Sequence, residues 1–344
     1  MKVSIASFNV ENLITAEKSI YGNTWPQYTT EQYPKKVGWI RNQLLNMNAD
    51  IIGFQEIFEE QALRDCLKGT HMENWHLFVA KPTGKLPVNA ILSKFPIVNT
   101  QVIEDIPFQF EFFDDRPVTP LLESSSIFIP ISHFSRGVLK AEIKLNDSVS
   151  LIVFVLHLKS KRPIYRDGFR ADAANYTEKA IGSIRSLIRR GIEAAGVRQL
   201  VSEQISVDNN KPLVVLGDLN DGDTSVTNQA IIGEPPYRKL KPEEKIKLWQ
   251  QVLQNVIDVQ ARKSIDNYHY TYIHNGHIES LDNIFVSNHF ADLNSAKIGR
   301  IIDVRAYNDH VIDTTVSMDR KPFHVSDHGQ IVVNIKLFDR VNWD

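Results

Sequence analysis

Apolar and polar residues alternate along the chain in two spacings, one typical of strands and the other of helices. Period-two or continuous β-branched runs predict strands at residues 3–10, 50–56, 75–80, 89–93, 138–145, 149–157, 212–217, 280–287 and 330–337. Apolar residues at helical spacing predict helices around residues 37–45 and 63–67, within 165–204, and at 249–257. Residues 104–134 and 300–323 follow neither spacing, so we expect them to be irregular.

Strands outnumber helices in this pattern, and many of the predicted connections are short. No internal repeat, low-complexity tract or linker-like composition divides the 344 residues. Strands and helices mixed in this way favour one α+β domain, residues 1–344, in which two sheets pack together.

Composition narrows the class of protein without fixing its activity. The chain is 42% hydrophobic and 23% charged, as globular domains are. Its formal net charge of -2 gives no global attraction to nucleic acid or anionic membrane, so any polyanion must bind a local patch. A single cysteine, Cys66, excludes an internal disulfide and a cysteine-rich zinc site.

The chain opens on a strand pattern rather than a charged and then apolar leader. No apolar run approaches the roughly 20 residues that span a bilayer. We therefore expect a cytoplasmic protein, monomeric and without stable membrane association.

Polar side chains follow several predicted strands at the point where each strand ends. The apolar run 213–216 leads through a glycine to Asp218 and Asn220. Such a stretch alone also fits a strand followed by an Asx-turn. The repetition of the pattern favours a shared site. The strand-end residues are Asn9, Glu56, His157, Asp218, Asn220, Asp282, Asp327 and His328.

These residue types suit metal-assisted chemistry on a phosphoryl group. Carboxylates and carboxamides without thiolates are the ligands of a hard cation such as Mg²⁺ or Mn²⁺. Histidines beside them serve as base, acid or charge stabiliser. The sequence has no phosphate-binding G-x-x-x-x-G-K-[ST] loop, no G-x-G-x-x-G, no H-E-x-x-H and no G-x-S-x-G. Taken singly, Glu56 also fits a strand-end salt bridge, His157 a surface histidine and Asp282 a turn cap.

Basic residues follow His157 along the chain. Lys159, together with Lys161 and Arg162, suits an anionic substrate. Lys159 and Arg170 are the candidates for contacts with substrate phosphates. The later arginines at 185, 189 and 190 are better interpreted as a solvated helix face.

Seven short segments, in this order, resemble the endonuclease/exonuclease/phosphatase (deoxyribonuclease-I-like) superfamily. The resemblance covers nearly the whole chain, and it is the order of the segments that makes it specific. The segments are Ser7-Phe8-Asn9-Val10-Glu11-Asn12, Phe54-Gln55-Glu56, Ala90-Ile91-Leu92-Ser93-Lys94-Phe95-Pro96-Ile97, Arg136-Gly137-Val138-Leu139 with His157, Gly217-Asp218-Leu219-Asn220, Leu281-Asp282-Asn283-Ile284-Phe285-Val286-Ser287 and Ser326-Asp327-His328.

The resemblance implies a four-layer α/β sandwich, in which two mixed β-sheets lie face to face with helices outside. It also implies a metal site at one edge of the sandwich, where strand ends meet. Glu56 would be the principal ligand of Mg²⁺ or Mn²⁺, with Asn9 beside it and Asp327 close to the metal.

The same resemblance implies catalytic roles for five residues. Asp218 and Asn220 would contact the scissile phosphate and the nucleophilic water. Asp282 would orient His328, which would act as base or phosphate contact. His157 would aid the leaving group or the phosphate. The implied reaction is in-line attack of water on a phosphoester.

Some positions depart from the family. The deoxyribonuclease branch pairs its first histidine with an acid near residues 89–91, where this chain has none, so the partner of His157 stays open. Gly329-Gln330 stands where many relatives have an acidic residue and a proline.

The favoured function is a metal-dependent phosphodiesterase, most simply an endo- or exonuclease acting on DNA or RNA. The alternatives are a phosphomonoesterase or phospholipid or inositol-phosphate hydrolase, and a catalytically idle binding module.

Overall fold

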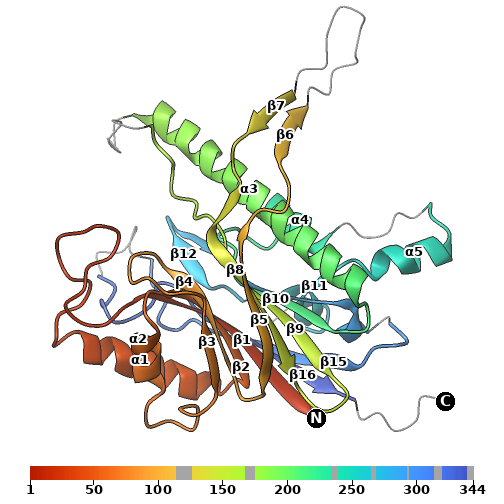
Figure 1. Ribbon diagram of the computed structural model, residues 1–344, viewed down its shortest axis with the longest axis horizontal. Coiled ribbons are helices and arrows are strands. Elements are labelled where there is room, and N and C mark those ends of the chain that lie inside the picture. Colours follow the sequence, from red (N-terminus) through yellow and green to blue (C-terminus); the bar gives the residue numbers. More distant parts are fainter. Residues whose placement is uncertain are drawn as a thin grey trace, which may run out of the picture.

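Two six-stranded β-sheets pack face to face, with helices on their outer sides (Figure 1). The computed structural model describes residues 1–113, 126–166, 175–233, 239–264, 269–292, 294–313 and 320–338. Each sheet contains parallel and antiparallel pairs. The expected sandwich of two mixed sheets flanked by helices is therefore confirmed.

The first sheet holds the N-terminal strand near its centre. β1 pairs in parallel with β2 and antiparallel with β16. The strand order is β15 (Gly299–Tyr307), β16 (Gln330–Leu337), β1 (Lys2–Leu13), β2 (Ile51–Ile57), β4 (Val88–Ser93) and β3 (His76–Val79).

The second sheet is centred on β10, which pairs in parallel with β9 and antiparallel with β14. Its register places Asp218 opposite His157 on one side and opposite Asp282 on the other. Three polar residues therefore reach the same edge. The strand order is β11 (Gln254–Asn255), β14 (Asp282–Val286), β10 (Leu213–Asp218), β9 (Ser150–His157), β8 (His133–Lys144) and β5 (Ile97–Asp105).

Helices cover the outer faces of the two sheets. Helices α1 (Tyr33–Met47) and α2 (Glu60–Leu67) pack on the first sheet. The long helix α3 (Tyr176–Val207) and the short α4 (Val226–Ile232) pack on the second. The smaller elements are α5 (Pro242–Trp249), α6 (Val256–Ala261), η1 (Asn288–Phe290), the hairpin β6 (Phe110–Phe113)–β7 (Ser126–Ile129) and the hairpin β12 (Tyr272–His274)–β13 (His277–Glu279). Among the described helices, none is both long and apolar enough to cross a membrane.

The two sheets pack closely because Gly53 on β2, which faces the other sheet, has no side chain. A Cβ on Gly53 would lie 2.2 Å from Leu216 Cδ1 in the opposite sheet. Around this point Ile5, Val155 and Ile284 are fully buried in the layer between the sheets. This layer fixes how the ends of the two sheets meet, and so positions every residue of the site.

Three expectations about elements were wrong. Residues 300–323 were expected to be irregular, but β15 occupies the first part of them, as an edge strand whose polar outer residues and bulge between Ile301 and Asp303 hide the alternation. Within 104–134, β6 and β7 pair as a hairpin. The helix expected at 249–257 is absent as a continuous element: α5 ends at Trp249, residues 250–255 are not helical and include β11, and α6 begins at Val256. Asn255 caps α6 by accepting a hydrogen bond from the amide of Ile257.

Candidate active site

A buried polar cluster lies at the edge where β2, β9 and β10 end and β14 begins, beside the last part of β1. The carboxamide of Asn9 joins the two sheets, because its Nδ2 donates to Asp218 Oδ2 (3.0 Å) and to Glu56 Oε1 (3.4 Å). Most of the residues expected at strand ends therefore come together, although Asn9 and Asp218 are 209 positions apart and the bond from Ser326 to Asn9 spans 317.

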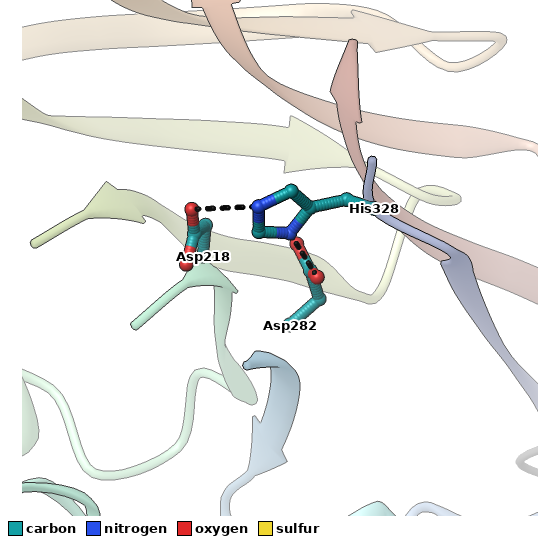
Figure 2. A group of neighbouring side chains, drawn as sticks. All are labelled: Asp218, Asp282 and His328. Atoms are coloured by element: carbon teal, nitrogen blue, oxygen red, sulfur yellow. Dashed lines mark hydrogen bonds and ion pairs between the residues drawn. The ribbon is translucent and has the colours of Figure 1, made fainter. Parts of the chain in front are cut away.

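His328 forms a buried pair with Asp282 (Figure 2). Its Nδ1 donates to Asp282 Oδ2 at 2.8 Å, and its Nε2 lies 3.8 Å from Asp218 Oδ2. Burial opposes the imidazolium, but the charges of Asp282 and Asp218 outweigh burial and raise the pKa of His328 well above its ordinary value. The structure thus favours a cationic His328.

The backbone around His328 is held to β1. Ser326 Oγ donates to the carbonyl of Asn9 (2.8 Å) and accepts from the amide of His328 (3.1 Å). Ring contact with Tyr272, whose centroid lies 5.1 Å from that of His328, covers one side of the imidazole. The Ser-Asp-His segment is therefore fixed in place although it lies outside regular secondary structure.

Asp218 lies at the centre of the cluster. Its Oδ1 accepts from the amide of Asn220 (2.8 Å), and its Oδ2 lies 3.4 Å from His157 Nε2. Burial raises the pKa of Asp218 to about 7. Near neutral pH the carboxyl therefore exchanges protons readily, as a general base requires. Asn220 itself is held by a bond from its Nδ2 to the carbonyl of Leu158 (3.1 Å).

His157 differs from His328 in its surroundings. Its Nε2 faces two carboxylates, at 3.4 Å from Asp218 Oδ2 and 3.9 Å from Glu56 Oε1. Burial, with the positive charges of Arg136 and His328, lowers the pKa of His157 well below its ordinary value. The two histidines therefore favour opposite states, cationic for His328 and neutral for His157.

Glu56 is less buried than Asp218 and Asp282, with its side chain 18% exposed. Its Oε2 accepts from the amide of Asn12 (3.0 Å). Glu56, Asn12, Glu11 and Asn220 all have φ between 54° and 64°, in the left-handed region that non-glycine residues rarely adopt. Backbone strain of this kind gathers at functional sites.

Asp327 is half-buried next to His328 in sequence, and its charge is among those that raise the pKa of His328 against the effect of burial. Burial first, and then the charge of Asp327, raise the pKa of Glu11, so these two acids are neighbours. Lys321 forms an ion pair with Glu11 and also donates to the carbonyl of Val325 (2.7 Å). This pair ties the segment before Asp327 to the end of β1.

The donor set fits a hard divalent cation. The candidate ligand atoms of Asp218, Asp282 and His328 lie within 4.8 Å of one another. A cationic His328 has no free lone pair for a metal ion, so the carboxylate oxygens of Asp218 and Asp282 are the donors of this group. Asp282 Oδ1 is buried without a hydrogen-bond partner among the described residues. The carboxylate of Glu56 adds further oxygens. Asn9 presents its Nδ2 to the acids while its Oδ1 accepts from the amide of Glu11 (3.0 Å), so it acts as a donor as placed.

Of the two predicted substrate-binding residues, the structure describes Lys159 alone. Lys159 Nζ donates to the carbonyl and hydroxyl of Ser160 and to the carbonyl of Arg162, at 3.0–3.1 Å, so it contacts its own loop. Arg170 lies outside the described residues.

Two site residues escaped the strand-end pattern. Arg136 donates to the carbonyl of Leu158 (3.0 Å), and its charge lowers the pKa of His157 and of Lys159. Arg136 is the first residue of a segment that resembles the family, and that position was the one sign of it in the sequence. Lys36 is fully buried on α1, and its Nζ has no hydrogen-bond partner in the described part of the chain. Lys36 lies in a segment whose apolar residues have helical spacing, so the pattern predicted a helix and did not mark this residue.

Comparisons with known proteins agree with this geometry. A family model described as the Endonuclease/Exonuclease/phosphatase family matches residues 6–328. A search of curated proteins finds no match.

Solved structures share the fold at low identity. Truncated TDP2 of Caenorhabditis elegans is 14% identical, with 97% of each chain covered and a TM-score of 0.55. An endonuclease/exonuclease/phosphatase family protein of Bacteroides thetaiotaomicron is 16% identical, with 99% of each chain covered and a TM-score of 0.53. D. rerio TDP2, complexed with a single strand DNA product, is 14% identical over 97% of this chain and 99% of its own, with a TM-score of 0.52.

Proposed function

Because the chain belongs to the endonuclease/exonuclease/phosphatase family, whose members are phosphoric ester hydrolases, we propose that it is a metal-dependent phosphodiesterase cutting DNA or RNA. The observation that carries the proposal is the buried His328–Asp282 pair facing Asp218. A histidine cation beside a carboxyl group whose pKa is about 7 suits hydrolysis of an anionic ester. We also propose that residues 1–344 form one catalytic domain, since the site draws on both sheets.

In this proposal each side chain of the cluster has its own role in the in-line attack of water on the phosphate. Asp218, with Asn220 beside it, accepts the proton of the attacking water as the new P–O bond forms and the bond to the leaving oxygen breaks. His328, oriented by Asp282, places its positive charge against the phosphate oxygens. His157 presents Nε2 to the same space and positions the phosphate or leaving oxygen.

A divalent cation would be held by Glu56, with Asn9 and Asp327 as the neighbouring ligands of the proposal. For Asn9 this requires its carboxamide to turn its oxygen toward the acids. Mg²⁺ or Mn²⁺ bound there supplies Lewis-acid stabilisation of the phosphate and leaving oxygens.

A nucleic acid substrate is supported by two observations. Arg136 lies beside the site, and Lys159 and Arg162 follow His157 in sequence, which supplies local positive charge on a chain of net charge -2. Lys161 of the same run is paired with Glu279 at 2.6 Å. A similar structure, D. rerio TDP2, is complexed with a single strand DNA product. The absence of a strong global positive charge favours a short or single-stranded substrate over a long duplex.

The test is cleavage of end-labelled single-stranded DNA, double-stranded DNA and RNA with Mg²⁺, Mn²⁺ or EDTA. We expect cleavage that EDTA abolishes and that Glu56→Gln and His328→Asn each lower by about 100-fold or more. The control variants are Glu60→Gln, at a side chain that is 43% exposed, and His76→Asn, at an exposed residue. Both are changes of the same chemistry and should cut like the wild type.

Absence of cleavage on every nucleic acid would contradict the nuclease proposal. A panel of phosphomonoesters, phospholipids and inositol phosphates with the same variants then separates the alternative hydrolases from a binding module. Cleavage that persists unchanged in EDTA would contradict the metal dependence.

A further inference from the structure

A half-exposed tyrosine lies beside the acid cluster. Tyr21 is 52% exposed, and its hydroxyl donates to Asn12 Oδ1 (3.1 Å). The amide of Asn12 in turn donates to Glu56 Oε2 (3.0 Å). Two hydrogen bonds therefore connect the phenol to the carboxylate that is proposed to hold the metal ion. Tyr21 thus lies next to the catalytic cluster without belonging to it.

The charges that act on Tyr21 place it in the same part of the molecule. Burial and then the charge of Glu56 raise the pKa of Tyr21 to about 12, while the charges of Arg136 and Arg162 oppose this rise. An acid of the site and two cations therefore surround one phenol. Aromatic rings interleaved with cations are the means by which proteins bind single-stranded nucleic acid.

The backbone at Tyr21 has a conformation that suits a smaller residue. The amide of Asn23 donates to the carbonyl of Ile20 (3.0 Å), which closes a tight turn with Tyr21 and Gly22 at its centre. Both central residues have positive φ, 56° and 74°, and turns of this kind favour asparagine, aspartate and glycine. A bulky residue with such a φ is a genuine outlier. Tyrosine therefore strains this turn, which points to a role for its ring outside the turn.

The turn belongs to a loop that has a small core of its own. Ile14, Ile20 and Tyr28 are buried together with Phe58, which follows β2. The ring of Tyr21 meets that of Phe58 edge-on, with centroids 5.5 Å apart and planes at 87°. These contacts hold the ring in place before a substrate arrives, which lowers the entropy cost of binding to it.

We propose that Tyr21 is a stacking platform for one unpaired nucleobase, that of a nucleotide next to the scissile phosphate. This rests on the proposed nuclease function and narrows it, because it names the substrate as single-stranded nucleic acid. With the scissile phosphate at the acid cluster, Arg136 and Arg162 would neutralise phosphates beside it. A base within a duplex must first be unstacked from its neighbours. Phospholipids and inositol phosphates have no base to stack.

Binding of short oligonucleotides in EDTA and at low salt tests the proposal without catalysis. The probes are a labelled thymidine oligonucleotide and a series in which an abasic spacer replaces one base at a time. At one position the missing base should weaken binding to the wild type about 10-fold. Tyr21→Asn, a change that suits the turn, should weaken binding of the intact probe by a similar factor and make the protein insensitive to that missing base. Tyr21→Phe keeps the ring and should remain sensitive.

The matched control is Tyr176→Asn, the same change at another exposed tyrosine. Tyr176 is 78% exposed and is the first residue of α3, at the end of that helix that extends away from the sheets (Figure 1). This variant should keep the full effect of the missing base. If Tyr21→Asn does not fold, Tyr21→Leu gives the same comparison.

Two results would overturn the platform. One is a wild type that binds the intact probe and every abasic probe equally, and the other is a Tyr21→Asn protein as sensitive to the missing base as the wild type. Cleavage of DNA or RNA with either result would leave the nuclease function standing without this platform. Base-dependent binding through Tyr21, without cleavage of any phosphoester, would refute the proposed function and leave the platform.

Discussion

At the scale of single residues, the site holds two buried histidines whose pKa values move in opposite directions. His328 and His157 are both almost fully buried, and both lie within 4 Å of Asp218. Only His328 also has a carboxylate, Asp282, on its second nitrogen among the described residues. Against the effect of burial, Asp282 and Asp218 raise the pKa of His328, whereas burial and then the charges of Arg136 and His328 lower that of His157.

Replacing Asp282 should therefore destabilise the protein in a pH-dependent way. Because the folded pKa of His328 is raised, its contribution to stability is fully present below about 6.5 and is lost as pH rises through the folded pKa. We expect Asp282→Asn to lower the free energy of unfolding by roughly 3 kcal/mol at pH 6, and by less at pH 9. Urea unfolding in EDTA at the two pH values measures the difference.

The control is Asp105→Asn, which breaks an exposed contact with His133 at 2.6 Å. Exposed pairs contribute little, so this variant should match the wild type at both pH values. An equal loss for Asp282→Asn at pH 6 and pH 9 would show that the charge of His328 is not what the pair stabilises.

At the scale of elements, glycines decide how closely strands and sheets approach. Gly217 has φ of +145°, and a Cβ there would lie 2.0 Å from the carbonyl oxygen of Leu156 on β9. At Gly53 the obstruction is the end of the Leu216 side chain. At Gly38 on α1 nothing lies within 4 Å.

Alanine substitutions at these three glycines should change the free energy of unfolding by different amounts, in an order that the structure predicts. Gly217→Ala should cost most, because neither its own backbone nor that of β9 can move without breaking the ladder that ends at Asp218. Gly53→Ala should cost about 1–3 kcal/mol through overpacking. Gly38→Ala should stabilise α1 by about 1 kcal/mol. Urea unfolding of the three variants checks the order, and a Gly217→Ala protein as stable as Gly53→Ala would contradict it.

The elements that carry the site were the predictable ones. Each of β1, β2, β9, β10 and β14 is an apolar run with a polar end, and that pattern depends only on neighbouring residues. The edge strand β15 was missed, because one face of an edge strand is polar and a bulge shifts its alternation. The division between α5 and α6 was missed, because apolar residues continue across the cap at Asn255.

Residues that act across elements were not predictable in the same way. Asn89 lies inside a predicted strand, and its hydrogen bond to the carbonyl of Val155 forms only because β4 faces β9. The charges of Arg136 and Lys36 likewise act on the site only once the sheets and α1 are packed together. By contrast, the pairing of Asp282 with His328 was expected from the resemblance to the family, and the structure places those two side chains in contact.

At the scale of the whole molecule, folding gathers acids from distant parts of the chain at one edge of the sandwich. Glu56, Asp218, Asp282, Asp327 and their neighbour Glu11 all lie at this edge. Lys321, which is paired with Glu11, and the buried Lys36 offset part of the negative charge. Both sheets contribute, so separating them would destroy the site. A cation that binds this cluster should therefore stabilise the fold as a whole.

Metal binding should be visible as a gain in stability that depends on Glu56. A ligand that binds only the folded state, at 100 times its dissociation constant, adds about 2.7 kcal/mol. We expect Mn²⁺ or Mg²⁺ to raise the free energy of unfolding in urea by this order, and EDTA to reverse it. Glu56→Gln should lose most of the gain, whereas the exposed change Glu60→Gln should keep it. If Glu56→Gln gained as much as the wild type, the stabilising cation would bind elsewhere on the protein, and Glu56 would not be its principal ligand.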